Sequence, residues 1–277
     1  MKKESLLVKQ LRSVKRKGKT IGFVPTMGYL HEGHLSLVRK AKKENDVVVV
    51  SIFVNPLQFA PQEDYKTYPR DLKRDARLLR GLCDFLFVPA AQQLYPRDFC
   101  TSVNVKALSD HLCGHSRKGH FIGVTTIVCK LFNIVMPDCA YFGQKDMQQA
   151  LIIQRMVKDL NYSIVVKVLP IMREKDGLAM SSRNAYLTKA QRQDAVVLFQ
   201  ALRSAQRLVS TGLTDAEKIK TLLRDFVLRN ESMRIDYIEI VDKTSLEPVK
   251  RLNKDVLLAL AVYVGKVRLI DNTILKV

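Results

Sequence analysis

This sequence of 277 residues lacks three features that would each point to a class of protein. Its longest apolar run, residues 256–264, is well short of the roughly 20 residues that a membrane-spanning helix needs. The basic stretch at its start is followed by no apolar segment of signal-peptide length, so we expect a cytoplasmic location. Tryptophan is absent, which gives no support to a surface that stacks single-stranded bases.

Cysteine is scarce, and the spacing of the cysteines matches no metal-binding or disulfide pattern. The chain has five cysteines, an odd number, and no two of them stand in the C-x-x-C spacing of a zinc knuckle. A disulfide framework is therefore not predicted, and free thiols in a reducing compartment fit best. The cysteines are Cys83, Cys100, Cys113, Cys129 and Cys139.

Basic residues outnumber acidic ones, 46 against 27, for a net charge of +19. Such an excess favours an acidic partner: nucleic acid, a membrane surface or a phosphorylated small molecule. Most of the excess lies within residues 1–184 and is spread over several predicted helices, without interleaved aromatic residues. We interpret it mainly as a solvated basic surface, with nucleic-acid binding as the less favoured alternative.

Hydrophobic periodicity predicts alternating strands and helices in the first part of the chain. The segment 47–54 is apolar at nearly every position, as is typical of a parallel strand covered by helices on both faces. We predict an α/β fold with a Rossmann-like parallel sheet flanked by helices, whose ligands bind at the carboxyl ends of the strands. The predicted strands are 21–25, 47–54, 85–88, 140–142 and 163–169, and the predicted helices are 33–44, 70–82, 121–135 and 146–160.

The pattern changes after Asn184. Two helices are predicted at about 188–210 and 214–230. Strand-like segments follow at 235–241, 256–264 and 268–270. We therefore predict a Rossmann-like domain over residues 1–184 and a smaller α+β domain over residues 185–277.

The segment PTMGYLHEGH, residues 25–34, lies between the first predicted strand and the first predicted helix. His31 and His34 are three positions apart, so near a helix start both can face an anionic ligand together with free backbone N–H groups. Gly33 would let a ribose or phosphate approach the backbone closely. The alternative is a turn with two capping histidines. A zinc site is not predicted, because the spacing is one residue short of HExxH.

The segment 173–184 follows the last strand of the predicted parallel sheet. Its residues Ser181, Ser182 and Arg183 offer two hydroxyls and a guanidinium in sequence, which suit the oxygens of a triphosphate and of a pyrophosphate leaving group. An ordinary loop or a helix N-terminus would have the same residues, and that alternative stays open at this point.

The segment YFGQKDMQQ, residues 141–149, runs from the end of a strand into a helix. Lys145 can reach a phosphate as a point charge, and Asp146 can accept hydrogen bonds from ribose hydroxyls. Gln149 lies one helical turn further on. The alternative is that Asp146 is a simple N-cap beside a solvated lysine.

The segment FVNPLQF, residues 53–59, follows the all-apolar strand. Asn55 and Gln58 offer neutral donors and acceptors suited to a small hydroxy acid, while Met27 and Phe59 could form apolar walls. A structural Asn-Pro turn is the alternative. All four segments follow predicted strands, so we expect them at one rim of the sheet, where together they would form a single site.

These motifs resemble the pantothenate synthetase, or pantoate–β-alanine ligase, family. The match covers nearly the whole chain, from residues 25–28 through GHF at 119–121 and KLFN at 130–133 to RLIDN at 268–272. HxGH is shared with the wider nucleotidylyltransferase superfamily. Its combination with FVNPxQF and KDxQQ in this order is highly specific.

The resemblance implies an enzyme that condenses pantoate with β-alanine, using ATP and Mg²⁺, to give pantothenate, AMP and pyrophosphate. It implies two steps, with pantoyl adenylate as the intermediate. It also implies a homodimer and a smaller C-terminal domain that closes over the site as a lid. Neither a membrane nor a nucleic acid is implied as a partner.

The resemblance also assigns roles, position by position. The catalytic contacts with the ATP phosphates fall on His31, His34, Lys145 and Arg183. The other ATP contacts, with adenine facing the backbone of Met172, fall on Met27, Gly33, Gly143, Asp146, Met172, Ser181 and Ser182. The pantoate contacts fall on Met27, Asn55, Gln58 and Gln149. No protein residue is assigned as a metal ligand.

Two residues depart from the family pattern in the segment 112–121. Cys113 stands where a glutamate is expected, and Lys118 stands where a proline is expected before Gly119. Losing the proline removes a fixed φ and adds a charge beside Arg117. We expect these departures to affect loop rigidity and catalytic rate, and not the fold.

Two rival functions make different predictions. Another adenylyl- or cytidylyltransferase would use the same histidines and basic loop but release a stable nucleotide adduct instead of AMP. A nucleic-acid-binding module would bind RNA or DNA with steep salt dependence.

Overall fold

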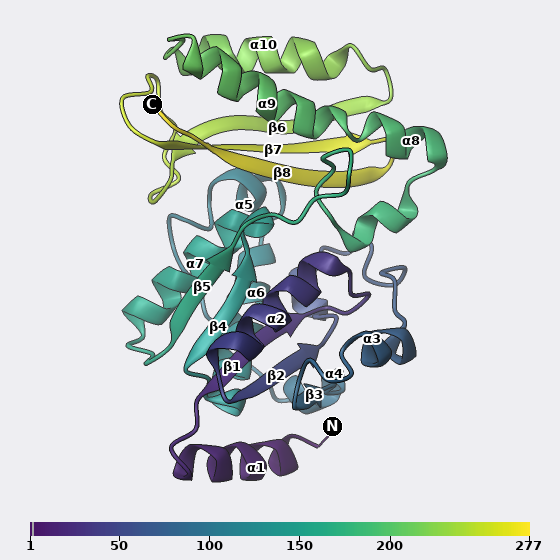
Figure 1. Cartoon of the computed structure of the whole chain (residues 1–277), viewed down its shortest axis with the longest axis vertical. Coiled ribbons are helices and arrows are strands. Elements are labelled where there is room, and N and C mark those ends of the chain that lie inside the picture. Colours follow the sequence, from purple (N-terminus) through teal and green to yellow (C-terminus); the bar gives the residue numbers. More distant parts are fainter. Residues whose placement is uncertain (2) are drawn as a thin grey trace. The chain divides into compact units, whose positions relative to one another are not determined.

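The computed structural model describes residue 1 and residues 3–277, and its contacts divide the chain into two compact units (Figure 1). The first unit consists of Met1–Lys106, Arg117–Gln144 and Gln149–Pro170. The second consists of Ala107–Ser116, Lys145–Gln148 and Ile171–Val277.

Contacts group residues 171–184 with the second unit, whereas the sequence pattern predicts a domain boundary after Asn184. The physical reason is that this segment is tied to the second unit by both apolar and ionic contacts. Leu178 lies in its apolar core, and Arg173 forms an ion pair with Asp271. The domain boundary after residue 184 and the lid role of residues 185–277 stay predictions.

The first unit is built on a five-stranded sheet in the order β3-β2-β1-β4-β5. Every pairing in it is parallel, so the predicted parallel α/β sheet is confirmed. All side chains of β2 are buried, as its apolar run predicts. The strands are β1 (Ile21–Thr26), β2 (Val47–Ile52), β3 (Phe85–Phe87), β4 (Cys139–Gly143) and β5 (Val165–Leu169).

Helices flank these strands, and two of them, α1 (Glu4–Arg16) and α4 (Ala91–Leu94), were not predicted. Helix α1 carries Leu7 and Leu11 four positions apart, so that both are fully buried while the charged residues around them stay at the surface. The helices of this part of the chain are α1 (Glu4–Arg16), α2 (Glu32–Glu44), α3 (Leu72–Leu78), α4 (Ala91–Leu94), α6 (His120–Val135) and α7 (Met147–Asp159), with a short 3₁₀ turn η1 (Pro56–Gln58).

Helix α6 packs directly against the backbone of η1 because residue 123 is glycine. A Cβ added to Gly123 would lie 2.3 Å from the carbonyl oxygen of Leu57 and 2.6 Å from the nitrogen of Gln58. Any other residue would therefore force the two elements apart. This contact places η1, at the carboxyl end of β2, on the first turns of α6.

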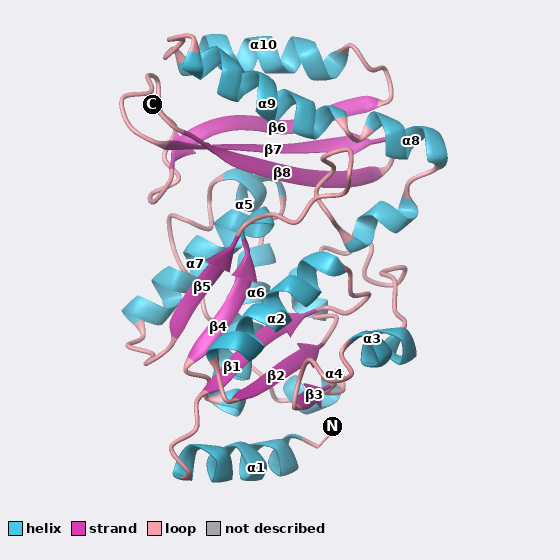
Figure 2. Ribbon diagram, in the orientation of Figure 1, coloured by secondary structure: helices cyan, strands magenta, loops and turns pink. Residues whose placement is uncertain are grey.

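The second unit contains a three-stranded antiparallel sheet in the order β6-β7-β8, formed by β6 (Met233–Asp242), β7 (Val256–Val264) and β8 (Val267–Leu275). Helices α9 (Val197–Ser210) and α10 (Ala216–Leu228) lie along one face of this sheet, as Figure 2 shows. Their apolar sides form its core together with the strands. The remaining elements are α5 (Leu112–Ser116), η2 (Gln144–Asp146), η3 (Ser182–Tyr186) and α8 (Lys189–Asp194).

The helix predicted over 188–210 is divided into α8 and α9 at Ala195 and Val196, whose dihedral angles remain right-handed helical. The break between α8 and α9 is therefore confined to these two residues. In the part of the chain that the structure describes, no helix is both long and apolar enough to cross a membrane.

Candidate active site

The loop between β1 and α2 is held in place by a buried carboxylate. Asp75, only 1% exposed, accepts hydrogen bonds from the backbone N–H groups of Tyr29 (2.7 Å) and Leu30 (2.8 Å). Gly28, which precedes them, has φ +87°, a conformation that L side chains rarely adopt. Sequence reasoning missed Asp75, because nothing local in a helix of mostly charged residues marks it as buried.

The two histidines lie at the start of α2. His31 is the N-cap residue, and its backbone N–H donates to Nδ1 of His34 at 3.3 Å. Their ring centroids are 4.1 Å apart. Because Nδ1 of His34 accepts, the proton of the neutral ring sits on Nε2, which is therefore its donor atom. The capping interpretation and the phosphate-binding interpretation of His34 are thus compatible. Its Nδ1 accepts the hydrogen bond at the start of the helix, and its Nε2 is the atom that can donate.

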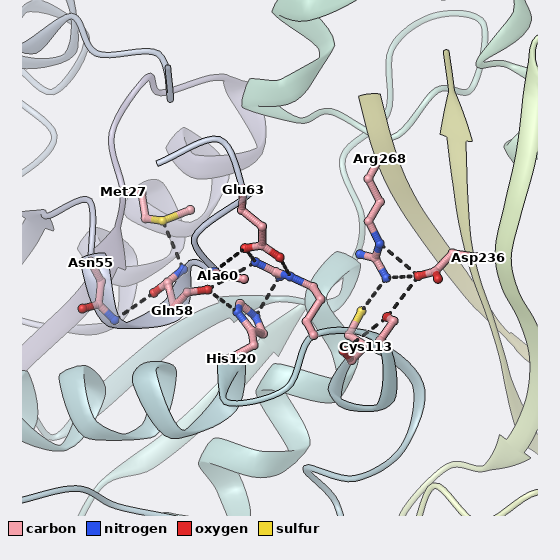
Figure 3. A network of polar contacts seen from close by, with 11 residues as sticks. Met27, Asn55, Gln58, Ala60, Glu63, Cys113, His120, Asp236 and Arg268 are labelled. Carbon is pink, nitrogen blue, oxygen red and sulfur yellow. Dashed lines mark hydrogen bonds and ion pairs between the residues drawn. The ribbon is translucent and has the colours of Figure 1, made fainter. Parts of the chain in front are cut away.

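Met27, Asn55 and Gln58 are brought together at the carboxyl ends of β1 and β2, as Figure 3 shows. The Gln58 Nε2 donates to Sδ of Met27 (3.2 Å), and the Asn55 Nδ2 donates to Oε1 of Gln58 (3.2 Å). Asn55 is 1% exposed and also donates to the carbonyl of Gly123 (3.0 Å). These three predicted pantoate residues therefore form one connected group.

Tyr95 completes this group from the C-terminal end of α4. Its hydroxyl donates to Oδ1 of Asn55 at 2.8 Å. Burial raises the pKa of Tyr95 well above its ordinary value, so the hydroxyl keeps its proton and remains a donor. Asn55 Oδ1 also accepts from the N–H of Leu57 (3.3 Å), so the side chain caps η1 and the structural Asn-Pro turn is confirmed. The role of Asn55 toward pantoate stays a prediction.

Gly143 ends β4, the neighbour of β1, and Gln149 lies on α7. In the sheet order, β2 and β3 lie on one side of β1, and β4 and β5 lie on the other. The order of the strands therefore reverses between β1 and β4, and parallel sheets bind ligands in the crevice at the carboxyl ends of the strands at such a point. The loop carrying His31 follows β1 and therefore lies at this end of the sheet.

The other predicted ATP residues belong to the second unit. Lys145 and Asp146 lie in η2, and the carbonyl of Lys145 accepts a hydrogen bond from Nδ2 of Asn272 at 2.9 Å. Lys145, Ser181 and Asn184 line a small cavity of about 10 Å³, which is about the room of one water molecule. The structure therefore brings two of the predicted phosphate contacts, Lys145 and Ser181, to one place within this unit.

The segment 173–184 is an ordered loop. Arg173 binds Asp271 through two hydrogen bonds, of 2.6 and 2.9 Å, and Asp271 is 1% exposed on its side chain. Gly177 leaves room for the ring of Phe199, because an added Cβ would lie 2.0 Å from it. These contacts hold the loop to β8 and α9.

Within this loop, Ser181 caps η3 by accepting the N–H of Arg183 at 3.3 Å, and Ser182 is buried. The helix-N-terminus interpretation of Ser181 is therefore part of the structure. The carbonyl of Met172 accepts the N–H of Met180 at 3.0 Å.

The two departures from the family pattern lie in different environments. Cys113 is buried, with its Sγ 3.1 Å from the hydroxyl of Tyr237 and 3.5 Å from Nη2 of Arg268, which in turn binds Asp236. Lys118 is exposed. The cysteine therefore fills an interior position beside a guanidinium, where the expected glutamate would meet a cation.

Arg117, next to Lys118, binds a partner that sequence reasoning missed. Its Nε and Nη2 donate to the two carboxylate oxygens of Glu63, both at 2.6 Å. Neither residue of this pair lies near the other in the sequence, so no local pattern could reveal it.

Comparison with known proteins gives a consistent result. The chain matches the family model described as Pantoate-beta-alanine ligase over residues 1–274. It is 57% identical to the pantothenate synthetase of Thermotoga petrophila over 95% of this chain and 94% of that protein, and 53% identical to that of Caldicellulosiruptor saccharolyticus over 96% and 95%.

Solved structures agree. The pantothenate synthetase from Thermus thermophilus superposes with a TM-score of 0.91 at 43% identity, covering 96% of both chains. The pantoate–β-alanine ligase from Francisella tularensis, solved with β-γ ATP and β-alanine, superposes with a TM-score of 0.77 at 39% identity over 96% of this chain and 95% of that one.

Proposed function

The chain belongs to the pantoate–β-alanine ligase family, an ATP-dependent ligase family, and we propose that it joins pantoate to β-alanine through a pantoyl adenylate. The observation that carries the proposal is the grouping of Met27, Asn55 and Gln58 at the carboxyl ends of β1 and β2, in the same unit as the histidines at the start of α2. The proposed hydroxy-acid subsite and the proposed anion-binding start of α2 thus follow two neighbouring strands of one sheet.

In the first step, a carboxylate oxygen of pantoate attacks the α-phosphorus of ATP. A new C–O–P linkage forms, the bond to the β-phosphate oxygen breaks, and pyrophosphate leaves. His31, His34, Lys145 and Arg183 donate to the phosphate oxygens and neutralise the charge that develops on them. Positioning and charge neutralisation suffice, so the protein supplies no nucleophile.

In the second step, the neutral amine of β-alanine attacks the activated acyl carbon. The amide bond forms, the C–O bond to AMP breaks, and the surplus amine proton passes to solvent. Pantothenate and AMP are released. The two acids and ATP supply every atom of these products, so no further reactant is needed.

The remaining assigned residues hold the substrates in place. Gln58 and Gln149 provide neutral amides for the hydroxyl and carboxylate oxygens of pantoate, and Met27 provides an apolar wall. Asn55 belongs to the same subsite and holds the amide of Gln58 in place by donating to its Oε1. The nucleoside and the rest of the phosphate chain are held by Gly33, Gly143, Asp146, Met172, Ser181 and Ser182.

Magnesium enters this scheme as part of the substrate. Among the residues that the structure describes, no three or more His, Cys, Asp or Glu side chains are grouped in a way that could hold a metal ion. Mg²⁺ commonly binds through substrate phosphates and water with few protein ligands. We propose that it arrives as Mg·ATP.

We also propose a homodimer formed through the edge of the parallel sheet. β5 is an edge strand, and Val165 in it is 57% exposed while Leu160, just before it, is 51% exposed. Large apolar side chains beside an unpaired strand edge favour association with a second chain. Light scattering after size-exclusion chromatography would show the dimer mass, and Val165→Lys would shift it to the monomer. A monomeric parent protein would overturn the proposal.

A cytoplasmic location is the last part of the proposal. It is supported by the five cysteines, all of them unpaired, and by the requirement for ATP.

The test is release of AMP and pyrophosphate from Mg·ATP with pantoate, with and without β-alanine. We expect AMP release only when both acids are present. A stable nucleotide adduct in place of AMP would show a different nucleotidyltransferase. Absence of any product would contradict the proposal.

A further inference from the structure

Gln58 is held at both ends by hydrogen bonds. Its side-chain amide contacts Met27 and Asn55, as described above. Its main-chain carbonyl lies 2.8 Å from Nδ1 of His120 and accepts from Nη2 of Arg117 at 3.3 Å. Groups from the β1 loop, from η1 and from the start of α6 therefore all converge on this one residue (Figure 3).

The ring of His120 is restricted to one tautomer by its neighbours. Nη1 of Arg117 lies 3.1 Å from Nε2 of His120, and a guanidinium can only donate. Nε2 must therefore accept, which places the proton on Nδ1. Nδ1–H is then the donor to the carbonyl of Gln58. Arg117 thus sets the proton position in the ring that holds Gln58.

Glu63 holds Arg117 in turn. The two oxygens of Glu63 accept from Nε and Nη2 of Arg117 in a bidentate pair, and Oε2 also accepts from the N–H of Ala60 at 3.3 Å. Burial by itself raises the pKa of Glu63, but the hydrogen bonds and charge of Arg117 outweigh it and leave the pKa below its ordinary value. Glu63 is therefore ionised at neutral pH, and its charge balances that of the guanidinium, which can only donate.

The ion pair with Glu63 determines how the guanidinium of Arg117 is oriented. Two of its three nitrogen atoms bind Glu63, and the third faces His120. The side chain is largely buried, at 15% exposure. A guanidinium in these contacts is oriented inward, and its charge is matched by a carboxylate at 2.6 Å. Its geometry fits a structural role toward Gln58 better than direct binding of a substrate anion.

We propose that Glu63, Arg117 and His120 are positioning residues for pantoate: they fix the carbonyl of Gln58 and thereby the direction of its side-chain amide. The inference rests on the proposed role of Gln58 in binding pantoate. It adds three residues that act through Gln58 and touch no substrate themselves. Their effect is specific to the pantoate subsite, because the contacts described here lead to Gln58 and not to the histidines of α2.

The experiment measures pantoate-dependent exchange of labelled pyrophosphate into ATP, which reports the first step alone. Arg117→Lys retains the charge but loses the bidentate geometry. His120→Ala removes the donor to Gln58, whereas His120→Asn keeps an N–H close to the position of Nδ1. We expect Arg117→Lys and His120→Ala to raise the KM for pantoate about 10-fold, the scale of one lost hydrogen bond, with the KM for ATP unchanged. The KM for pantoate of His120→Asn should stay close to that of the parent protein.

A double-mutant cycle tests whether the action passes through Gln58. In a Gln58→Ala background, Arg117→Lys should add no further rise in the KM for pantoate, since the group that it positions is gone. Arg97→Lys, an exposed arginine in the same unit, is the matched control and should leave all constants unchanged. Thermal melting of each variant separates loss of folding from loss of positioning.

The outcomes are distinguishable. Unchanged KM for pantoate in the folded variants, equal rises in the KM for ATP, or additive effects in the cycle would overturn the positioning role. If Arg117→Lys does not fold, the comparison of His120→Asn with His120→Ala decides alone. Loss of exchange in the parent protein would contradict the proposed function instead.

Discussion

Asn272 of β8 donates a hydrogen bond from its side-chain amide to the main-chain carbonyl of Lys145, 2.9 Å away and 127 positions earlier in the chain. The contact holds η2, the turn that carries the lysine, against the C-terminal sheet of the same unit. Lys145 is a long, flexible side chain, so fixing its backbone restricts where its ammonium group can reach.

Asn272→Ala should therefore lower kcat about 10-fold, the scale of one lost hydrogen bond, while the KM for pantoate stays unchanged. The measurement is steady-state AMP release over a range of pantoate concentrations. Thr273→Ala, the neighbouring substitution, removes a hydrogen bond from Gln206 and serves as control. Equal kcat in the two variants would refute the role of Asn272.

Removing one of the proposed phosphate contacts should cost far more. His34→Ala, Lys145→Ala and Arg183→Ala are each expected to lower turnover by roughly 10² to 10³, the usual loss for one donor to a developing charge. Lys175→Ala removes an exposed lysine of the second unit and should have no effect. Near-normal turnover in a folded Lys145→Ala variant would contradict its assignment.

Glu44 gives the protein a defined acid sensitivity. Hydrogen bonds from Lys40, Lys167 and Tyr141 lower the pKa of Glu44 from 4.5 to about 2. Between these two values the unfolded chain carries the extra proton and the folded chain does not, so the free energy of unfolding falls as pH drops from 4.5 toward 2. Above pH 4.5 this contribution is complete.

Urea unfolding at a series of pH values checks this prediction. Glu44→Gln cannot titrate, so its free energy of unfolding should fall less steeply between pH 4.5 and 2 than that of the parent protein. Parallel profiles for the two proteins would show that Glu44 does not contribute.

The close approach of α6 to η1 predicts that Gly123→Ala is harmful to both stability and binding. The added Cβ would lie 2.3 Å from the carbonyl oxygen of Leu57, and overpacking of this kind costs about 1–3 kcal/mol. We expect a Tm lower by several degrees and a raised KM for pantoate, because Gln58 moves with η1. For the Tm alone, Gly143→Ala is the control, since nothing lies within 4 Å of its added Cβ. An unchanged Tm in Gly123→Ala would contradict the packing argument.

Much of the fold could be predicted from local pattern. The all-apolar segment at 47–54 predicts a buried parallel strand, and β2 is one; the alternation around it predicts the rest of the sheet. Helix α1 was missed, because its apolar stripe is short within a strongly charged segment. The division of the helix over 188–210 was missed as well, since its residues remain helical in pattern on both sides of Ala195.

For the candidate site, the sequence by itself determined which chemical groups follow which strands: histidines after β1, neutral amides after β2, a lysine after β4 and a serine-arginine loop after β5. Short-range periodicity and strand order carry that information. Only the tertiary structure decided which distant residues fix the candidate site: Glu63 binds Arg117, 54 positions away, and Asn272 binds the carbonyl of Lys145, 127 positions away. Such pairs depend on how distant elements pack, and no local pattern along the chain records that.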